Sequence, residues 1–562
     1  MNQIARAPRR HPSEFVAEMS FGDLAGVRIS FINMPLRESA QPNTPPQGPA
    51  LLAARLRQYG ADVNIVDLNA YRIKDELAGL DKSGRHLTYD EARRLITCHF
   101  DRHGEPHVIG LSGMITTLRW QEEIVRQCRE VVPDAFMVSG GGLSTELKDG
   151  LFEWMPELDA VAHSEGDDIV LVLAKVVRDA LRRGMAGRAR ALEESGFFIG
   201  RIGDRDRYVF GGDRPIDLDN LPFAAWDLLD QDVYGNRIIE QYISVPVWGL
   251  AANNSSATPF TMHRSLTTVS SRGCPYACAF CYRGAQGERN YGMRTAQNVA
   301  AEARWLVDTY NVDFVGFPDD NFAVDKRRIA QLPGAFAELG IRWGTHTRLD
   351  EADERLEDMA RSGCVYIGFG AESASPNTLE HMRKGGHILR RGTQRINGYD
   401  LPTTMVEGIR KCREVGIHAN CTWIMGFPGE RLDDLKASVA FILWQRGLYT
   451  QGFTPGTPEY ANQVASVNSR MFTATAYPGT EMFALPSVRD KLTKNFGIAF
   501  DKVGQPLFDA AFRNYVLELD DATKLMHGTD GQPLNFGAMP DDKFVEARAL
   551  ADRGEIEKIL DI

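Results

Sequence analysis

The stretch SSRGCPYACAFCYRG, residues 270–284, places Cys274, Cys278 and Cys281 within eight residues. The spacing C-x3-C-x2-C lets one short loop bring three thiolates around a single iron–sulfur cube. A [4Fe–4S] cluster normally takes four thiolates, so three of them leave one iron open for an outside ligand. The stretch therefore predicts a cluster that carries out chemistry at the end of a strand.

Other uses of three nearby cysteines fit this chain less well. A zinc site would need a fourth ligand, but no second C-x2-C follows and the nearest histidine, His263, lies upstream. A disulfide framework is disfavoured because 8 cysteines in 562 residues are sparse and no secretory segment is expected. Chance grouping of the three cysteines is the remaining alternative.

Size and composition limit what the chain can be. A chain of 562 residues is longer than a single hydrophobic core usually supports, so we expect two or three domains. The composition, 43% hydrophobic and 25% charged, is typical of a soluble globular protein. A net charge of −11 gives no electrostatic reason for a nucleic-acid or membrane partner, and no run of about 18 apolar residues predicts a membrane span.

The first residues and the other cysteines indicate the compartment. Residues 1–15 lack the apolar segment of a signal peptide, and we expect residues 1–26 to form a disordered or extended tail. Cysteines outside the cluster motif lie in apolar or helical contexts, where buried free thiols are expected. These features favour a reducing cytoplasm, which also suits an oxygen-sensitive cluster. The five cysteines are Cys98, Cys128, Cys364, Cys412 and Cys421.

Residues 27–185 predict an open α/β domain. Apolar segments alternate with helical ones, which is typical of a doubly wound, mostly parallel sheet with ligands at the carboxyl ends of its strands. No G-x-G-x-x-G follows the first strand, which disfavours a dinucleotide, whereas Gly140–Gly142 would let a large flat ligand approach the backbone. A Rossmann-like domain without ligand is the alternative. The expected strands are 27–33, 61–71, 107–114, 135–142 and 158–168.

The rest of the chain predicts a second domain of the α/β class. After a linker over residues 186–262, strand and helix patterns alternate through residues 263–483. Five or six such units favour a partial (β/α)6 barrel, whose chemistry belongs at the carboxyl ends of the strands. The cysteine loop follows the first of these strands. Residues 484–562 predict a small, mostly helical C-terminal domain.

The order of these pieces resembles the cobalamin (B12)-dependent radical SAM family, of the class B methyltransferase type, and within it the phosphinate P-methylase branch. In that family the loops of the first domain surround a corrin ring and its nucleotide tail. The resemblance implies cobalamin contacts from Pro46, Ser112, Met114, Gly140, Gly141, Gly142 and Glu165. The family's better-known cobalt-binding motif, D-x-H-x-x-G, is absent, and the matching loop offers only Asn33, Met34 and Pro35. This departure implies a lower cobalt face without a strong protein ligand.

The resemblance also implies a site for S-adenosylmethionine (SAM) in the barrel. Asp319, Asp320 and Asn321 match a segment that holds the SAM amino group, and Arg348 of an R-x-D element would suit the carboxylate. Three ordinary explanations stay open: a helix cap for the aspartates, an ion pair with Asp350 for the arginine, and a plain turn at Gly429–Glu430. Further contacts are implied for Phe280, for Glu372 near the ribose and for Gly426 near adenine.

A basic insert interrupts the barrel between residues 380 and 404. It carries six cationic or titratable side chains in an otherwise acidic protein, and it is either a solvated surface loop or the anion-binding edge of a substrate pocket, with Arg390 and Arg391 as the substrate contacts. These side chains are Arg383, Lys384, His387, Arg390, Arg391 and Arg395.

The resemblance implies a reaction in which the reduced cluster cleaves SAM to a 5′-deoxyadenosyl radical. Methylcobalamin would then methylate an unactivated carbon or a phosphinate phosphorus of a small-molecule substrate, as in antibiotic biosynthesis. A second SAM would remethylate the cobalt, and an external donor such as flavodoxin or ferredoxin would supply electrons. Two alternatives stay open: an oxidative cyclase or ring-rearrangement enzyme that uses the same cofactors, and a non-catalytic protein that binds a cluster or cobalamin.

Overall fold

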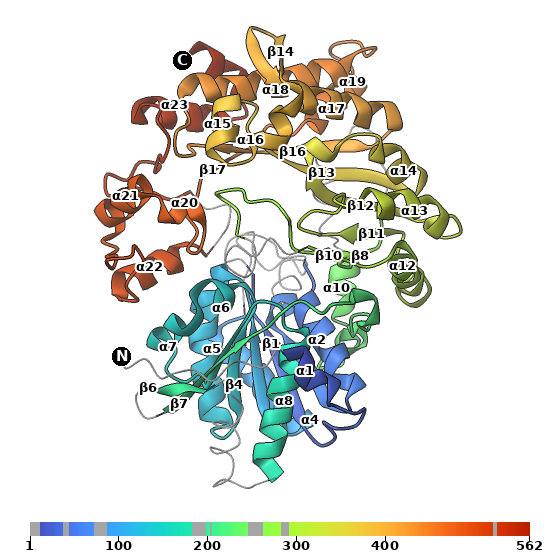
Figure 1. Ribbon diagram of the computed structural model, residues 1–562, viewed down its shortest axis with the longest axis vertical. Helices are drawn as coiled ribbons and strands as arrows, with labels where there is room; N and C mark the ends of the chain where they lie inside the picture. The colour runs from blue at the N-terminus through green and yellow to red at the C-terminus, as the bar shows by residue number, and fades with distance from the viewer. Residues whose placement is uncertain are drawn as a thin grey trace. The chain divides into compact units, whose positions relative to one another are not determined.

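A computed structural model describes residues 12–36, 44–71, 87–182, 198–202, 205–244, 262–282, 291–520 and 525–562 (Figure 1). The chain divides into two compact units. The first comprises residues 1–242, 284–286 and 507–524, and the second comprises residues 243–283, 287–506 and 525–562. The expected disordered tail falls partly on residues 1–11 and the expected linker partly on residues 186–197 and 245–261, all of which lie outside the described residues.

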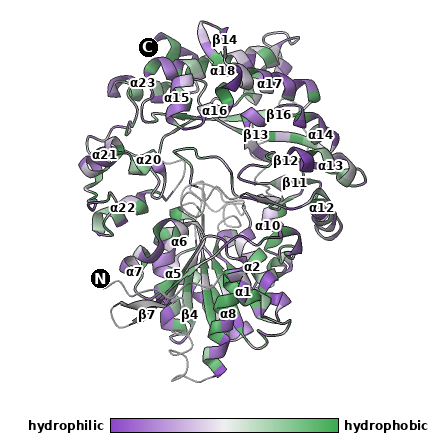
Figure 2. Ribbon diagram, viewed as in Figure 1, coloured by the Kyte–Doolittle hydropathy of each residue, from purple (hydrophilic) through white to green (hydrophobic). Residues whose placement is uncertain are grey.

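The first unit is built on a seven-stranded sheet in the order β2-β1-β3-β4-β5-β7-β6. Every neighbouring pair is parallel except β6 with β7. The central strands are almost continuously buried and hydrophobic, as parallel strands covered on both faces must be (Figure 2). The strands are β1 (Arg28–Asn33), β2 (Asp62–Asp67), β3 (Val108–Ser112), β4 (Phe136–Gly140), β5 (Ala160–His163), β6 (Phe198–Ile202) and β7 (Arg205–Gly211).

Helices cover this sheet, with α2 (Gln47–Gln58) packed against α8 (Asp167–Arg182) and α4 (Tyr89–His103) against α5 (Leu118–Val131). The start of α4 is fixed by a capping box between Thr88 and Glu91, which satisfies two backbone N–H groups that the helix leaves unpaired. The doubly wound α/β architecture expected from the sequence is confirmed. The shorter helices are α6 (Gly142–Leu147), α7 (Leu151–Trp154) and α10 (Ile239–Ser244).

Three segments of the first unit differ from the expected domain layout. Residues 12–17 form α1 (Pro12–Ala17), which contacts α8, rather than an extended tail. The β6–β7 hairpin, which we expected within the linker, extends the sheet beside β5. Helix α22 (Ala510–Glu518) belongs to this unit although it lies near the C-terminus, and Arg513 of α22 pairs with Glu122 of α5.

The second unit contains a six-stranded parallel sheet in the order β8-β11-β12-β13-β16-β17. Its strands follow one another in chain order and curl into part of a barrel, so the expected partial (β/α)6 fold is confirmed (Figure 1). The strands are β8 (Ser265–Thr267), β11 (Phe314–Phe317), β12 (Arg342–Arg348), β13 (Cys364–Glu372), β16 (His418–Met425) and β17 (Met471–Thr473).

Five helices link these strands and bury large aromatic side chains against them. Trp343 and Trp423 are fully buried, and the Phe317 and Trp343 rings lie 5.5 Å apart between centroids. These contacts hold the strand ends in place, because close-packed aromatic side chains leave little room for movement. The helices are α12 (Ala296–Tyr310), α13 (Lys326–Phe336), α14 (Arg355–Arg361), α17 (Thr403–Val415) and α18 (Leu432–Thr450).

The basic insert is a folded part of the second unit. It contains α16 (Gly385–Ile388) and a hairpin of β14 (Thr393–Ile396) with β15 (Tyr399–Pro402). Of the helices in the described part of the chain, none is long and apolar enough to cross a membrane. The remaining elements are β9 (Ser271–Arg272), β10 (Gly292–Met293), α15 (Pro376–His381), α19 (Pro458–Ser466), α20 (Glu481–Ala484), α21 (Pro486–Phe496) and α23 (Asp541–Asp552).

Candidate functional site

The cysteine loop begins directly after β9 and is fixed by backbone hydrogen bonds at both ends. The Gly273 N–H donates to the Asp320 carboxylate at 3.2 Å. Farther along, the Ala279 N–H donates to the Met382 carbonyl at 2.9 Å, and the Met482 N–H donates to the Ala279 carbonyl at 2.8 Å. The loop is therefore set by groups from three distant parts of the second unit.

Asp319 binds the two serines that lead into this loop. Its carboxylate accepts from the Ser270 N–H at 2.8 Å and from the Ser270 and Ser271 hydroxyls, each at 2.5 Å. Arg328 donates to the carbonyl and hydroxyl oxygens of Ser270, both at 3.0 Å. Burial raises the pKa of Asp319, and the Arg328 guanidinium opposes that rise. The carboxylate, predicted as a SAM contact, is used to hold the strand that leads into the loop.

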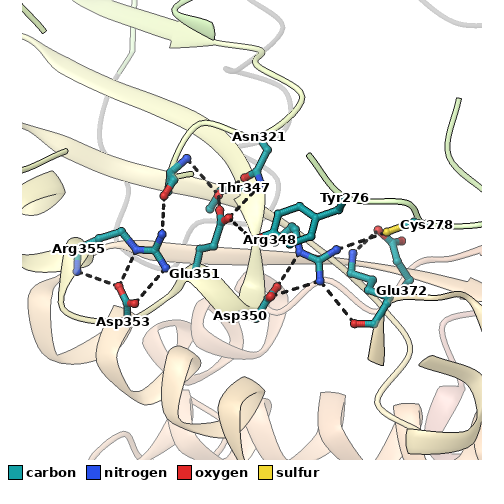
Figure 3. Close-up of polar contacts among 12 residues, drawn as sticks. Tyr276, Cys278, Asn321, Thr347, Arg348, Asp350, Glu351, Asp353, Arg355 and Glu372 are labelled. Carbon is teal, nitrogen blue, oxygen red and sulfur yellow. Dashed lines mark hydrogen bonds and ion pairs between the residues drawn. The ribbon is translucent and has the colours of Figure 1, made fainter. Parts of the chain in front are cut away.

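Asn321, the third residue of that predicted SAM segment, belongs to a buried network (Figure 3). Its amide donates to the Glu351 carboxylate at 3.1 Å. The Thr347 hydroxyl lies 2.6 Å from oxygens of both Asn321 and Glu351. The network ends at Tyr276 of the cysteine loop, whose hydroxyl donates to Glu351 at 3.0 Å. Of the three residues, only Asp320 is exposed, and its carboxylate accepts from the Gly273 N–H of the loop.

Arg348 connects the end of β12 to the cysteine loop. Its guanidinium donates to Asp350 at 2.9 Å and to the Lys384 carbonyl at 3.4 Å. A third donor lies 3.4 Å from the Cys278 sulfur, and the Tyr276 ring covers the guanidinium with 4.0 Å from Cζ to the centroid (Figure 3). The ion-pair explanation for Arg348–Asp350 is thus present in the structure, and the pair sits against a predicted cluster ligand.

Glu372 ends β13 in a backbone conformation that is costly for a residue with a side chain. Its φ is 64°, in the left-handed region, which costs roughly 1–2 kcal/mol for a residue other than glycine. The carboxylate faces the Lys384 ammonium at 3.4 Å and the Thr422 hydroxyl at 3.4 Å. Strain of this kind is retained where the surrounding structure needs that side-chain position.

Lys384 is a buried cation beside these groups. Its side chain is 4% exposed, and its ammonium lies 5.9 Å from the centroid of Phe280. Among the described residues, Glu372 is its hydrogen-bond partner, at the long distance of 3.4 Å. An ammonium has three donors, so this lysine keeps the capacity to bind an anion at the site.

The end of β16 meets the loop through aromatic side chains. Phe280, before the last cysteine, lies 6.3 Å from Phe427 between ring centroids. Gly426 has a φ of 77°, and a Cβ atom there would lie 2.6 Å from the Phe544 ring, so only glycine fits. The Gly426 N–H donates to Glu430 at 2.5 Å, and burial raises the pKa of Glu430 to about 8. The Gly426–Glu430 turn is thus firmly packed.

The three thiols fit a cluster that brings positive charge. Burial raises the pKa of Cys274, and burial together with the Cys278 charge raises the pKa of Cys281 to about 12. Thiolates at these positions therefore need cations nearby, which iron would supply on binding. In the described part of the chain, no three His, Cys, Asp or Glu side chains converge on a single metal ion. A four-iron cube instead takes its thiolates from around a larger body.

The first unit gathers its predicted residues along one edge of its sheet. The strand register places Asp67, Asn33, Ser112 and Gly140 in one row, at the last paired positions of β2, β1, β3 and β4. In a sheet of this order, β2 is added on one side of β1, whereas β3 and the strands after it are added on the other side. The topological switch point therefore lies between the parallel strands β1 and β3, and ligands of doubly wound proteins bind at such a point. Met114 follows β3 with 54% of its surface exposed.

The glycines along this edge have two different roles. A Cβ atom at Gly113 would lie 2.1 Å from the Thr117 hydroxyl, and one at Gly141 would lie 2.7 Å from the Gly113 carbonyl. Both are required by packing, and Gly141 also has a φ of 86°. At Gly140, by contrast, a Cβ atom would meet nothing nearer than 4.0 Å. Packing within the protein therefore does not require a glycine at position 140. The open space beside Gly140 fits a ligand that lies flat against the backbone.

The loop after β1 presents no free coordinating side chain in the part that the structure describes. The Asn33 amide donates to Asp67 at 2.8 Å, and the Met34 side chain is fully buried. Tyr242 donates to the same Asp67 carboxylate at 2.5 Å, and burial raises the pKa of Asp67 to about 6. Residues 37–43, the rest of this loop, lie outside the described residues.

Two other predicted cobalamin residues lie near that edge. Pro46 is buried and precedes α2 as its N-cap, and Glu165 is half-buried between β5 and α8. The speculative substrate residues are placed in the second unit. There Arg391 forms an ion pair with Glu407, while Arg390 is exposed.

Sequence reasoning did not single out Tyr276, Glu351 or Lys384 as site residues. Tyr276 stands inside the cysteine motif and Lys384 inside the basic insert, so each had a local signal. Glu351 had none, because its role depends on Asn321, which follows a different strand, β11, as well as on Thr347 near the end of β12.

Comparison with known proteins agrees with this arrangement. Residues 268–442 match the Radical SAM superfamily. An uncharacterized methyltransferase of Pyrococcus horikoshii is 24% identical over 76% of this chain and 82% of its own length. Cytidylyl-2-hydroxyethylphosphonate methyltransferase of Streptomyces wedmorensis is 25% identical over 78% of this chain and 77% of its own length.

A solved structure shares the fold. The radical S-adenosylmethionine methyltransferase TsrM from Kitasatospora setae, determined with tryptophan and a SAM analogue, aligns over 94% of this chain and 88% of its own, with a TM-score of 0.57 and 17% identity. Its likeness extends over both units of the present chain and supports the fold assignment.

Proposed function

We propose that this chain, a member of the radical SAM superfamily, is a cobalamin-dependent methyltransferase that acts on a small molecule. The observation that carries the proposal is the pairing of two strand-end sites in one chain. One is a three-cysteine loop clamped by polar side chains, and the other is a glycine-rich sheet edge with an unfilled position at Gly140. A cluster with SAM and a corrinoid are the groups that suit these two sites.

In the second unit, Cys274, Cys278 and Cys281 would hold the cluster, and bound SAM would supply a radical and a methyl donor. The chain's own residues position the reactants. Asp320, exposed beside the loop, suits the SAM ammonium. Because the Arg348 guanidinium is engaged by Asp350 and the cysteine loop, we assign the SAM carboxylate to the Lys384 ammonium. Glu372, held in a strained conformation, would accept from the ribose hydroxyls.

In the first unit, Ser112, Met114 and Gly140–Gly142 would form the surface on which the corrin rests. Asn33 and Met34 are engaged inside the protein, so the cobalt would have no protein ligand from the described part of that loop. A cobalt without a strong lower ligand gives up a methyl group more readily. The cluster requires reducing, oxygen-poor conditions, so we place the enzyme in the cytoplasm with an external electron donor.

The experiment is anaerobic reconstitution with iron, sulfide and a cobalamin, followed by incubation with SAM and a reductant. Mass spectrometry then measures 5′-deoxyadenosine and S-adenosylhomocysteine. A methyltransferase makes S-adenosylhomocysteine as cobalamin is remethylated, and SAM labelled in its methyl group passes the label to cobalamin. This labelling of cobalamin needs no knowledge of the acceptor.

The other outcomes would identify the rival functions. 5′-Deoxyadenosine without S-adenosylhomocysteine, and without labelled cobalamin, would favour the cyclase or ring-rearrangement reaction. Neither product, in a protein that has taken up iron and corrinoid, would favour a non-catalytic binding protein. Either result contradicts the proposal.

A further inference from the structure

Residues 507–524 belong to the first unit, although the chain on both sides of them belongs to the second unit. We call their first part, residues 507–519, the strap. Its helix α22 packs against α5 and against the 3-10 helix Ile115–Thr117. Both of these elements follow β3, and they lie next to the segments on which we place the corrin. We call those segments, residues 112–117 and 140–147, the corrin-facing loops.

An aromatic contact attaches the start of the strap to α7. The Phe508 ring lies 5.1 Å from the Trp154 ring between centroids, and the Trp154 indole N–H donates to the Phe508 carbonyl at 3.3 Å. A Cβ atom at Gly150 would lie 2.1 Å from the Phe508 ring, so a side chain there would displace the strap. Gly150 and Trp154 follow the second corrin-facing loop in the chain, and the strap therefore holds the segment into which this loop leads.

An ion pair attaches the middle of the strap to α5. The Arg513 guanidinium donates to both carboxylate oxygens of Glu122, at 2.6 and 2.7 Å. The amide of the neighbouring Gln121 donates to the Thr117 hydroxyl at 3.3 Å and accepts from the Ser139 hydroxyl at 2.6 Å. Thr117 ends the first corrin-facing loop, and Ser139 directly precedes the second. The turn of α5 that the strap holds is therefore bonded to both loops.

The two corrin-facing loops also bind each other. The Gly113 carbonyl accepts from the Leu143 N–H at 3.4 Å, and α6 packs against the 3-10 helix Ile115–Thr117. A shift of one loop would therefore disturb the other. Elements that hold α5 and α7 in place hold the whole of this surface.

The strap depends on these contacts for its own folding. Helix α22 has nine residues, fewer than the roughly 12–15 that an isolated helix needs to be even marginally stable in water. Its apolar side chains Phe512, Tyr515 and Val516 are at most 1% exposed. Undocking would expose these side chains and melt the helix, so docking of the strap and formation of α22 are one event.

We propose that the strap is a positioning element for cobalamin: when docked it fixes the corrin-facing loops, so that strap docking and cobalamin binding favour each other. Phe508 and Arg513 are then positioning residues that act through α7 and α5. The inference rests on the proposed function, because it requires the corrin to lie on these loops. Coupling of this kind is reciprocal, so bound cobalamin must stabilise the docked strap by the same factor by which the docked strap raises cobalamin affinity.

The first test is amide hydrogen exchange of the full-length protein, measured by mass spectrometry with and without hydroxocobalamin. We expect exchange in residues 510–518 to slow about fivefold or more on binding, a factor at the lower end of typical coupling between sites. The corrin-facing loops should slow as well. Slower exchange in those loops with no change in the strap would overturn the proposal. Failure of the wild-type protein to bind hydroxocobalamin would instead contradict the proposed function.

The second test removes both anchors in the double variant Phe508→Ala/Arg513→Glu. We expect its affinity for hydroxocobalamin, followed by absorbance, to fall about fivefold or more. Adding Glu122→Arg restores opposite charges at the ionic anchor and should recover part of this loss, which a general loss of folding would not allow. Exchange in β1 and β2 should stay slow in all of these variants, because the sheet remains folded.

The matched control is Phe21→Ala/Arg57→Glu, which also removes one aromatic contact and one bidentate ion pair from the first unit. The Phe21 ring lies 5.6 Å from the Tyr59 ring between centroids, and Arg57 donates to both carboxylate oxygens of Asp227. Its cobalamin affinity should equal that of wild type. An equal affinity in Phe508→Ala/Arg513→Glu, or no recovery on adding Glu122→Arg, would overturn the proposal.

Discussion

The two sheets differ in the side chains that they carry at the carboxyl ends of their strands. In the second unit that edge is crowded with charged and amide side chains, such as Asp319, Arg348 and Glu351, which bond to the cysteine loop and to one another. In the first unit the corresponding edge is nearly bare: Gly140–Gly142 contribute no side chain, and Asn33 is turned to Asp67.

The difference reflects what each edge has to hold. A cluster and a charged cosubstrate need ligands and counter-charges at fixed positions, and these must be supported by further hydrogen bonds. A large flat ligand needs room along the backbone and few side chains that would obstruct it. The predictions that follow test this contrast, beginning with the largest effect.

The largest effect is expected from Cys278→Ser, which removes a predicted cluster ligand at the crowded edge. We expect loss of the cluster and of all SAM cleavage, because a serine hydroxyl does not replace a thiolate on iron. Iron and sulfide content and electron paramagnetic resonance measure the first, and 5′-deoxyadenosine the second. The buried Cys412→Ser serves as control. A Cys278→Ser protein with a full cluster would contradict the ligand assignment.

At the bare edge, Gly140→Leu should weaken cobalamin binding while the protein still folds, because a Cβ atom there meets nothing nearer than 4.0 Å. A side chain forced against the corrin costs about 1–3 kcal/mol, which weakens binding roughly tenfold or more. Titration with hydroxocobalamin, followed by absorbance, measures the affinity. Gly113→Leu is the matched contrast: its Cβ atom would lie 2.1 Å from Thr117, so it should destabilise the fold itself. Unchanged cobalamin affinity in Gly140→Leu would remove Gly140 from the site.

Lys384→Met tests the cation that tertiary structure places at the crowded edge. Losing a charged hydrogen bond costs about 1.5–3 kcal/mol, so SAM should bind about 10- to 100-fold more weakly. Decarboxylated SAM should bind wild type and variant alike, because it lacks the group that Lys384 would hold. Isothermal calorimetry measures all four affinities, with Lys411→Met as a control. An equal loss for both ligands would show that Lys384 only supports the loop.

Asp319→Asn tests whether this carboxylate supports the loop or touches SAM. An amide cannot accept from all of the Ser270 and Ser271 donors, which should cost about 1–3 kcal/mol of stability and lower the thermal midpoint. SAM affinity of the folded, cluster-loaded protein should stay the same, whereas Asp320→Asn should weaken it. A specific loss of SAM affinity in Asp319→Asn would restore the original prediction for this residue.

The smallest effect concerns the interior of the first unit. Burial lowers the pKa of His99 to about 3, where its ring lies 2.7 Å from the Asn64 carbonyl oxygen. In the unfolded chain the histidine pKa is near 6.5, so between about pH 6.5 and pH 3 the unfolded chain binds a proton at His99 and the folded protein does not. His99 therefore reduces stability as pH falls below about 6.5, by about 1.4 kcal/mol per pH unit. Thermal midpoints at pH 7 and pH 5 should differ less in His99→Gln than in wild type. An equal difference would contradict the assignment.

Several features could be predicted from local sequence because each is carried by a few neighbouring residues. The cysteine spacing fixed the position of the loop at a strand end, and strand–helix alternation predicted both parallel sheets. Local pattern failed for β6 and β7, which we expected in a linker, because their pairing with β5 is a long-range contact. It also gave no sign that α22, close to the C-terminus, belongs to the first unit.

Within the site, the sequence by itself determined which residue types are present: three thiols in register, acids and a glycine run after successive strands. Only the tertiary structure decided what each does. It turned Asp319 and Asn321 inward, bound Arg348 to Asp350 and Cys278, and left Lys384 with spare donors and Gly140 with open space. The physical reason is that a polar group binds a ligand only when no nearer partner satisfies it. Several of those partners lie far away in the chain, such as Ser270 for Asp319 and Cys278 for Arg348.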